Sequence, residues 1–275
     1  MGSSSCPGGQ SFGKYNNIYY VAYSERGTNY LTISEVNSVT FDVIATHNYT
    51  TAMHPNGMFI KNDNIYIIDS TNNLIYTIDI NDMSITNINN DFAVYNIFGG
   101  CIDENGQAYL IGTLDGDKTV FVIDDSFNIT SQITLEAFEG PSWMVTQNLL
   151  VYDNTIYYLI NRPNCLVCYD MDGHFTGVRE IGESDGFYPY GELECLTYDG
   201  NDVLLMATPY VIDGTTLHTY FQVFKTNIGG AIAGGSKYGQ SYPPKGHFKW
   251  YFKRDGRFLL GVNLPFNCNS TEYWT

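Results

Sequence analysis

The chain is organised around residues 56–69, whose sequence is NGMFIKNDNIYIID. An apolar run, a polar turn at Asn62 and Asp63, and a second run rich in β-branched and aromatic residues predict two strands joined in a hairpin. Two further runs, residues 74–80 and 84–88, follow across short polar turns. Four short antiparallel strands of this kind have faces that they cannot bury alone. The unit therefore needs neighbouring copies of itself.

The same unit recurs along the chain at a nearly fixed period. The second strands of its copies are expected at residues 17–21, 64–68, 107–111, 155–159 and 202–206. From Ile18 onward, successive copies are 47, 43, 48 and 47 residues apart. A period of about 40 to 50 residues with four strands per repeat is typical of a β-propeller, whereas the alternative, a two-layer β-sandwich, predicts no fixed period. The sequence thus predicts an all-β, five-bladed β-propeller of four-stranded antiparallel blades.

The repeats divide the chain into three parts. Residues 1–9 are small and predict a flexible start, and the propeller is expected over residues 10–228. Its blades are expected to end near Thr51, Asn90, Phe138, Ser184 and Asn227. Residues 229–275 hold a Gly-rich linker and a hairpin expected around Asp255-Gly256. This last part is either a short C-terminal hairpin extension or a segment that completes the last blade and closes the ring.

The charge of the chain excludes some classes of partner. Its formal net charge is −16, with only 13 Lys and Arg. Nucleic acid needs cations to neutralise its phosphates, so no nucleic-acid partner is expected, and an anionic membrane surface is equally disfavoured. The acidity is interpreted as keeping a Tyr-rich β protein soluble; cation binding by the Asp-rich loops is the alternative. No cofactor is expected, with Ca²⁺ as the one candidate ion.

Two cysteines form a lone C-x-x-C at Cys165 and Cys168. They fall within an expected strand, and no second pair of ligands is spaced to complete a zinc site with them. Buried free thiols are therefore expected.

Function on a propeller is carried by loops rather than by blades. The first strand of each blade lines the axis, and the loops that enter these strands open together at one end. Aromatic and amide side chains recur in these loops, and the expected ligand-binding residues are Gln10, His54, Asn56, Tyr95, Trp143, Tyr188, Tyr190 and Glu192. Aromatic faces stack on sugar rings and polar side chains bind hydroxyls, so the set predicts a saccharide ligand. Alternatively, these side chains plug the channel as core.

Three short motifs carry a resemblance to a known family. Gly9-Gln10, the element at residues 54–58 (HPNGM) and the recurring Asn-x-Ile-Tyr strands resemble the five-bladed propeller platforms of receptor-binding proteins in the tail tips of phages that infect Gram-positive bacteria. The resemblance covers residues 9–227. It implies a non-catalytic, extracellular component of the virion tail, homotrimeric in the intact tail protein, that recognises a cell-wall glycan such as glycosylated teichoic acid. Because an acidic protein repels polyphosphate, recognition would rest on the sugars or on a bridging cation.

Two other functions stay open. Propellers also host glycoside hydrolases and calcium-dependent lactonases, which need axial carboxylates or a metal cage. Glu192 and Glu194 lie on one side of an expected strand, too close in sequence to flank a sugar as acid and base. A propeller enzyme is therefore the second hypothesis, and a structural scaffold that presents other domains is the third.

Overall fold

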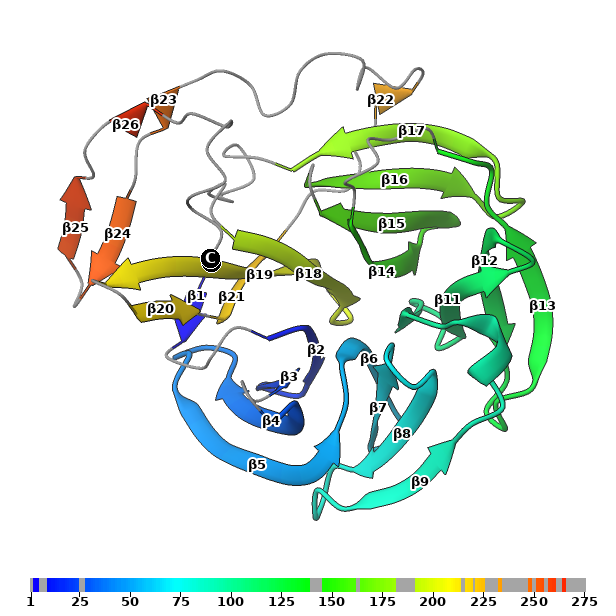
Figure 1. Ribbon diagram of the computed structural model, residues 1–275, viewed down its shortest axis with the longest axis horizontal. Coiled ribbons are helices and arrows are strands. Elements are labelled where there is room, and N and C mark those ends of the chain that lie inside the picture. The colour runs from blue at the N-terminus through cyan, green and yellow to red at the C-terminus, as the bar shows by residue number, and fades with distance from the viewer. Residues whose placement is uncertain are drawn as a thin grey trace. The chain divides into compact units, whose positions relative to one another are not determined.

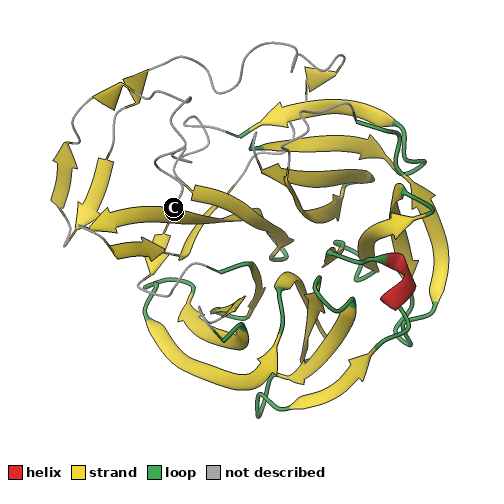
Figure 2. Ribbon diagram, viewed as in Figure 1, coloured by secondary structure: helices red, strands yellow, loops and turns green. Residues whose placement is uncertain are grey.

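The computed structural model describes residues 2–4, 9–24, 28–138, 145–161, 164–181, 191–213, 216–219, 221–225, 232–233, 247–248, 251–254, 257–260 and 264–265. The chain divides into two compact units, Met1–Gly235 and Ser236–Thr275. In the first unit, sheets are arranged around a common centre (Figure 1). Figure 2 shows that the described residues are almost entirely strand and loop, with one short 3₁₀ helix, η1 (Ala93–Tyr95). None of the described helical residues forms a segment long and apolar enough to cross a membrane.

Four antiparallel sheets are built from strands that follow one another in the chain. The first sheet holds β2 (Ser11–Tyr15), β3 (Ile18–Ser24), β4 (Tyr30–Asn37) and β5 (Val43–Ala52). The second holds β6 (Pro55–Lys61), β7 (Asn64–Asp69), β8 (Leu74–Asp79) and β9 (Ile85–Asn89). The third holds β10 (Gly99–Ile102), β11 (Ala108–Leu114), β12 (Asp117–Ile123) and β13 (Ile129–Thr134). The fourth holds β14 (Val145–Tyr152), β15 (Thr155–Asn161), β16 (Cys165–Asp170) and β17 (Phe175–Glu180), with β22 (Ile232–Ala233) added at its edge. The prediction of a propeller with four-stranded antiparallel blades is confirmed.

A further sheet joins the two ends of the first unit. It holds β18 (Gly191–Tyr198), β19 (Val203–Asp213), β21 (Phe221–Lys225) and β1 (Gly2–Ser4), with β20 (Thr216–Thr219) paired to the end of β19. The predicted flexible start is therefore wrong for residues 2–4, which pair with β21. A strand at a sheet edge needs only backbone donors and acceptors, and Gly and Ser supply these without large side chains.

The first strands of these sheets lie at the centre of the arrangement. Strand β2 contacts β6, β6 contacts β10, and β10 contacts β14. Strand β18 contacts β14 on one side and β2 on the other (Figure 1). The inner strands pack so closely at Gly57 that a Cβ atom there would lie 2.8 Å from the backbone nitrogen of Gly100.

The apolar core lies between neighbouring sheets. Along β7, Ile65 and Ile67 pack on the first sheet, with Leu31 and Ile33, whereas Ile68 packs on the third sheet. This division follows from the period of two in a strand, which sends alternate side chains to opposite faces. Alternate residues of β7 thus join the second sheet to both of its neighbours.

The turns between third and fourth strands share a structure that the sequence analysis missed. Each begins with an Asn or Asp whose side-chain or backbone groups accept hydrogen bonds within the turn, namely Asn37, Asp79, Asp124 and Asp170. Two residues before the fourth strand, each has a residue in the left-handed region, namely Phe41, Met83, Phe127 and Gly173. Some of the acidic residues of the chain therefore serve to stabilise turns, because Asp side chains accept hydrogen bonds from the backbone that follows them.

The second unit contains short paired strands. Strand β24 (Tyr251–Arg254) pairs with β25 (Arg257–Leu260), which is the hairpin predicted around Asp255-Gly256. Strand β23 (His247–Phe248) pairs with β26 (Leu264–Pro265). Within the described residues, these four strands pair only with one another, so the edge strand of the β18 sheet comes from the start of the chain instead.

Candidate functional site

Gln10 and His54 meet where the first two inner strands begin. Gln10 directly precedes β2, and His54 directly precedes β6. The amide nitrogen of Gln10 lies 3.2 Å from Nδ1 and 3.0 Å from Nε2 of the His54 ring, and both side chains are half-buried. Ser24 donates a hydrogen bond of 3.3 Å to Oε1 of Gln10. Gln10 and His54 are 44 positions apart, and both are predicted to bind ligand. They are in contact at the end of the propeller where the chain enters the inner strands.

Asp69 holds the backbone around His54. Its Oδ1 accepts hydrogen bonds of 3.0 Å from the backbone N–H groups of His54 and Thr71. Its Oδ2 accepts one of 2.7 Å from the Asn72 side chain, and the residue is fully buried. The sequence analysis did not select Asp69, although an Asp at the end of a strand before Ser-Thr-Asn is a recognisable turn signal.

Asn56 is directed across the centre rather than toward a ligand. Its Nδ2 donates hydrogen bonds to the backbone carbonyls of Phe98, at 2.6 Å, and Gln147, at 2.8 Å. The side chain is 5% exposed. Both hydrogens of the Asn56 amide are therefore used within the protein. The expectation that this amide donates hydrogen bonds to a ligand is corrected. The physical reason is the close convergence of the inner strands, which lets one amide reach two of them.

Asn148 makes the matching contacts deeper in the centre. Its Oδ1 accepts a hydrogen bond of 3.0 Å from the Gly100 backbone, and its Nδ2 lies 2.9 Å from Sγ of Cys195. Burial raises the pKa of the Cys195 thiol to about 11, so this thiol stays protonated at neutral pH and is a poor nucleophile. Two buried amide side chains, those of Asn56 and Asn148, thus connect the inner strands at the centre. Cys165 and Cys168 are buried thiols outside any disulfide, as predicted.

Tyr95 does not join the Gln10 and His54 pair. It lies in η1, where its ring is 4.8 Å from that of Phe121 and 6.3 Å from that of Phe92. These contacts place it against the core between the second and third sheets. The expectation that Tyr95 faces a ligand at the axis is corrected, because the η1 turn folds its ring back over β12.

Four more predicted residues are not assigned to the site. Trp143, Tyr188 and Tyr190 lie outside the described residues. Glu192 lies in β18, where its backbone is opposite Thr208. In the part of the chain that the structure describes, Gln10 and His54 are therefore the two predicted site residues that lie together at the inner-strand entrance.

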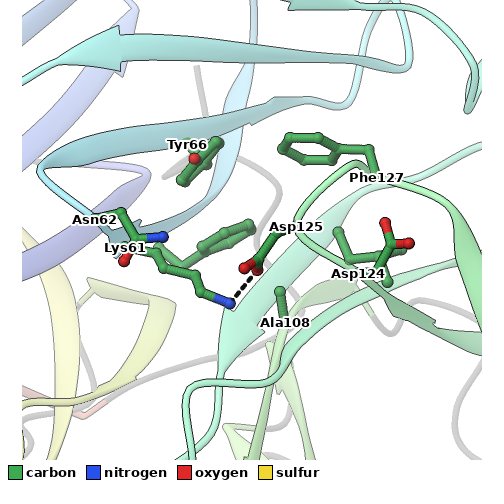
Figure 3. Close-up of a pocket in the computed structure, with 9 residues that line it drawn as sticks. Lys61, Asn62, Tyr66, Ala108, Asp124, Asp125 and Phe127 are labelled. Carbon is green, nitrogen blue, oxygen red and sulfur yellow. Dashed lines mark hydrogen bonds and ion pairs between the residues drawn. The ribbon is translucent and has the colours of Figure 1, made fainter.

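A pocket lies between the second and third sheets, at the end of the inner strands opposite to Gln10 and His54. It has a volume of about 50 Å³ and is lined by Phe59, Lys61, Asn62, Tyr66, Ala108, Ile123, Asp124, Asp125 and Phe127. Figure 3 shows Lys61 reaching across the pocket to Asp125, with the rings of Tyr66 and Phe127 on the other side. Lys61 also donates a hydrogen bond of 2.8 Å to the carbonyl of Gly106. The sequence analysis did not predict this pocket.

One exposed turn has side chains of the kind that bind metal ions. Ligand atoms of Asp170, Asp172 and His174 lie within 4.8 Å of one another. The backbone explains this grouping, because Oδ1 of Asp170 accepts hydrogen bonds from the N–H groups of Asp172 and His174, at 3.0 and 2.9 Å. The turn between β16 and β17 brings these residues together without an ion.

The sheet arrangement defines the chain as a β-propeller. No family model matches the sequence, and no curated protein matches it. Among solved structures, glutaminyl cyclase from Myxococcus xanthus is similar with a TM-score of 0.57 and 10% identity, over 82% of this chain and 94% of that one. The Dos1 propeller has a TM-score of 0.40 and 11% identity, over 80% and 59%. The Swd1 β-propeller domain of Myceliophteria thermophila has a TM-score of 0.40 and 10% identity, over 82% and 75%. At these identities the likeness concerns the fold alone.

Proposed function

We propose that this chain is a non-catalytic receptor-binding domain of a phage tail-tip protein, which recognises a host cell-wall saccharide such as a teichoic-acid sugar. The observation that supports this is the pairing of Gln10 with His54, half-buried and joined within 3.0 Å at the entrance of the inner strands. An amide and an imidazole together offer donors and acceptors, which suits hydroxyl groups that also do both. Neither side chain requires a charged ligand.

The proposal includes a propeller of five blades, with the β18 sheet as the fifth. Its inner strand β18 lies between β14 and β2, and its outer strand β1 comes from the opposite end of the first unit. Lys14 of β2 forms an ion pair of 2.6 Å with Asp199, which follows β18. Phe12 and Cys195 share one apolar cluster. These contacts favour a ring that closes between the first and the fifth blade.

The proposal also extends to assembly and location. The domain belongs to a homotrimeric tail protein on the outside of the virion, with a cell-wall saccharide as its partner. It needs no cofactor for this recognition, although Ca²⁺ would bridge to a phosphate-bearing glycan if the polymer backbone is bound as well. A net charge of −16 would otherwise repel such a backbone.

Adsorption to purified Gram-positive cell walls tests the proposed site. Gln10→Ala and His54→Ala should each lower the adsorption constant about fivefold, which is the loss expected for one hydrogen bond. His47→Ala is the matched control, because His47 bonds Glu35 at 2.7 Å on the first sheet, away from the inner-strand entrance. Equal adsorption of all three variants and the unaltered chain would contradict the assignment of the site.

The same preparation separates the other hypotheses. Release of reducing sugar from the walls that is abolished by Glu192→Gln would replace the binding function with a glycoside hydrolase. No adsorption to any cell wall, with normal folding, would favour a structural scaffold.

A further inference from the structure

We propose that the pocket between the second and third sheets is a second binding site, which takes a methyl group carried by a neutral, hydroxylated ligand. It is distinct from the Gln10 and His54 pair. Those residues join the starts of β2 and β6, whereas Tyr15 at the end of β2 donates a hydrogen bond to the Asp63 carboxylate just beyond β6. Lys61, on the pocket rim, is the last residue of β6. The two sites therefore lie at opposite ends of the inner strands.

The pocket exists because one sheet departs from the repeat. Ala108 begins β11 and pairs with Ile102 of β10 and Ile123 of β12. The residue before the equivalent turn lies opposite Tyr19 in the first sheet, Ile65 in the second and Ile156 in the fourth. A larger side chain thus stands at this position in the first, second and fourth sheets than in the third. The missing methyl groups leave space directly above Ala108, which lines the pocket.

Aromatic rings form the walls of this space. The rings of Phe59 and Tyr66 are stacked, with centroids 4.9 Å apart and planes at 23°. The Phe127 ring lies 5.4 Å from that of Tyr66 at 57° (Figure 3). Phe127 has a φ of 63°, a conformation that is unfavourable for a bulky residue, and at the equivalent turn of the fourth sheet the residue is Gly173. Phe41 and Met83 hold the equivalent positions of the first and second sheets with a similar φ, so these turns share the conformation. In the third sheet the ring at this position lines the pocket.

The size and charge of the pocket select the ligand group. A volume of about 50 Å³ is far below that of pockets that enclose whole ligands, which start at about 300 Å³, but it holds a group the size of a methyl. The Lys61 ammonium is paired with the Asp125 carboxylate, so neither charge awaits a partner of opposite sign. An aromatic wall and an apolar base formed by Ala108 and Ile123 suit a methyl group, and the exposed Asn62 on the rim suits the hydroxyls beside it.

Two kinds of neutral sugar carry such a methyl group, namely N-acetylated amino sugars and 6-deoxy sugars. Saturation-transfer NMR on the full chain with N-acetylglucosamine, rhamnose and glucose tests the proposal and separates these sources. The methyl protons of at least one of the first two sugars should receive the strongest saturation, and glucose should receive little. Equal saturation of all three, or saturation of ring protons without the methyl, would overturn the proposal.

Variants then locate the contact. Ala108→Ile introduces the side chain of the second and fourth sheets and should reduce methyl saturation about tenfold by filling the pocket, while the melting temperature stays the same or rises. Phe127→Gly should reduce it similarly by removing a wall. Phe41→Gly is the matched control, because Phe41 has the same φ of 63° in the equivalent turn of the first sheet. Unchanged methyl saturation in Ala108→Ile and Phe127→Gly would refute the site.

Two more variants keep the test decisive if the core changes prevent folding. Asn62 has a φ of 50° and Asn16, in the equivalent hairpin of the first sheet, a φ of 55°, so Gly is compatible with the backbone at both. Asn62→Gly should weaken methyl saturation and Asn16→Gly should not; equal effects of both would contradict the proposal. Gln10→Ala should leave methyl saturation intact, so that failure of the cell-wall site and failure of this pocket are distinguishable.

Discussion

Asn56, on the inner strand of the second sheet, donates a hydrogen bond of 2.8 Å to the backbone carbonyl of Gln147 on the inner strand of the fourth. The two residues are 91 positions apart. The same nitrogen also donates to the carbonyl of Phe98, on the segment that enters the third sheet. One amide thus joins three sheets at their centre.

Asn56→Ala should destabilise the fold, because it leaves two buried carbonyls without their donor. The expected loss is about 1 to 3 kcal/mol for each unsatisfied group. Urea unfolding followed by fluorescence would measure it. Asn87→Ala, an exposed position on β9, is the control and should change little. Unchanged stability with lost adsorption to cell walls would instead restore Asn56 to the ligand site.

The turn carboxylates should make stability depend on acid pH. The Asn128 side chain, followed by its backbone N–H, lowers the pKa of Asp124, and the His174 backbone N–H lowers the pKa of Asp170. A carboxyl group with a lower pKa in the folded state stabilises the fold above its unfolded pKa of about 3.9, and this contribution is lost as pH falls through the folded value. The melting temperature should therefore decrease on acidification below about pH 4.

Asp124→Asn and Asp170→Asn should flatten this acid dependence, because Asn still caps the turn but does not titrate. Asp115→Asn, in the exposed turn before β12, is the control. Melting curves recorded across the acid range would show a slope shared by the control and the unaltered chain. An identical slope in all variants would mean that other groups govern acid unfolding.

Tyr49 should protect the fold at alkaline pH. Its hydroxyl donates a hydrogen bond of 2.8 Å to the Met83 carbonyl, and burial, with the nearby Asp82 and Glu35 charges, raises its pKa to about 12. Because the folded pKa exceeds the ordinary value of about 10, the contribution is complete below pH 10 and is lost as pH rises toward the folded value. Tyr49→Phe should cost about 1 kcal/mol at neutral pH and weaken the alkaline dependence. Chemical unfolding at several pH values would measure both effects, and a Tyr49→Phe curve parallel to that of the unaltered chain would contradict them.

Removal of residues 1–4 should destabilise the sheet that contains β18. Strand β1 covers the outer edge of β21, pairing Gly2 with Val223 and Ser4 with Phe221. Without it, the backbone of β21 is exposed at the edge, and hydrogen exchange of residues 221–225 should accelerate relative to β7. Equal exchange in the shortened and the complete chain would show that β1 adds nothing to the closure.

The sequence alone determined the class of fold, because strand periodicity and turn chemistry depend on near neighbours. Ile65 and Ile67 alternate with Tyr66 and Ile68, and this pattern already requires a sheet covered on both faces. The repeat spacing then supplies the covering sheets. The pairing of Gln10 with His54 also follows from the repeat, since both residues precede inner strands of neighbouring sheets.

Only the tertiary structure decided the roles of Asn56, Tyr95 and Ala108. Asn56 is an ordinary polar loop residue until the inner strands converge and bring the Phe98 and Gln147 carbonyls within reach of one nitrogen. Tyr95 is an ordinary loop aromatic until η1 turns its ring onto Phe121. Ala108 is a small residue in a strand until Phe127, from a turn that follows it in the same sheet, and Tyr66, from the neighbouring sheet, enclose the space above it. Such contacts join segments that are distant in the chain, and the local pattern of a sequence does not encode the distance between them.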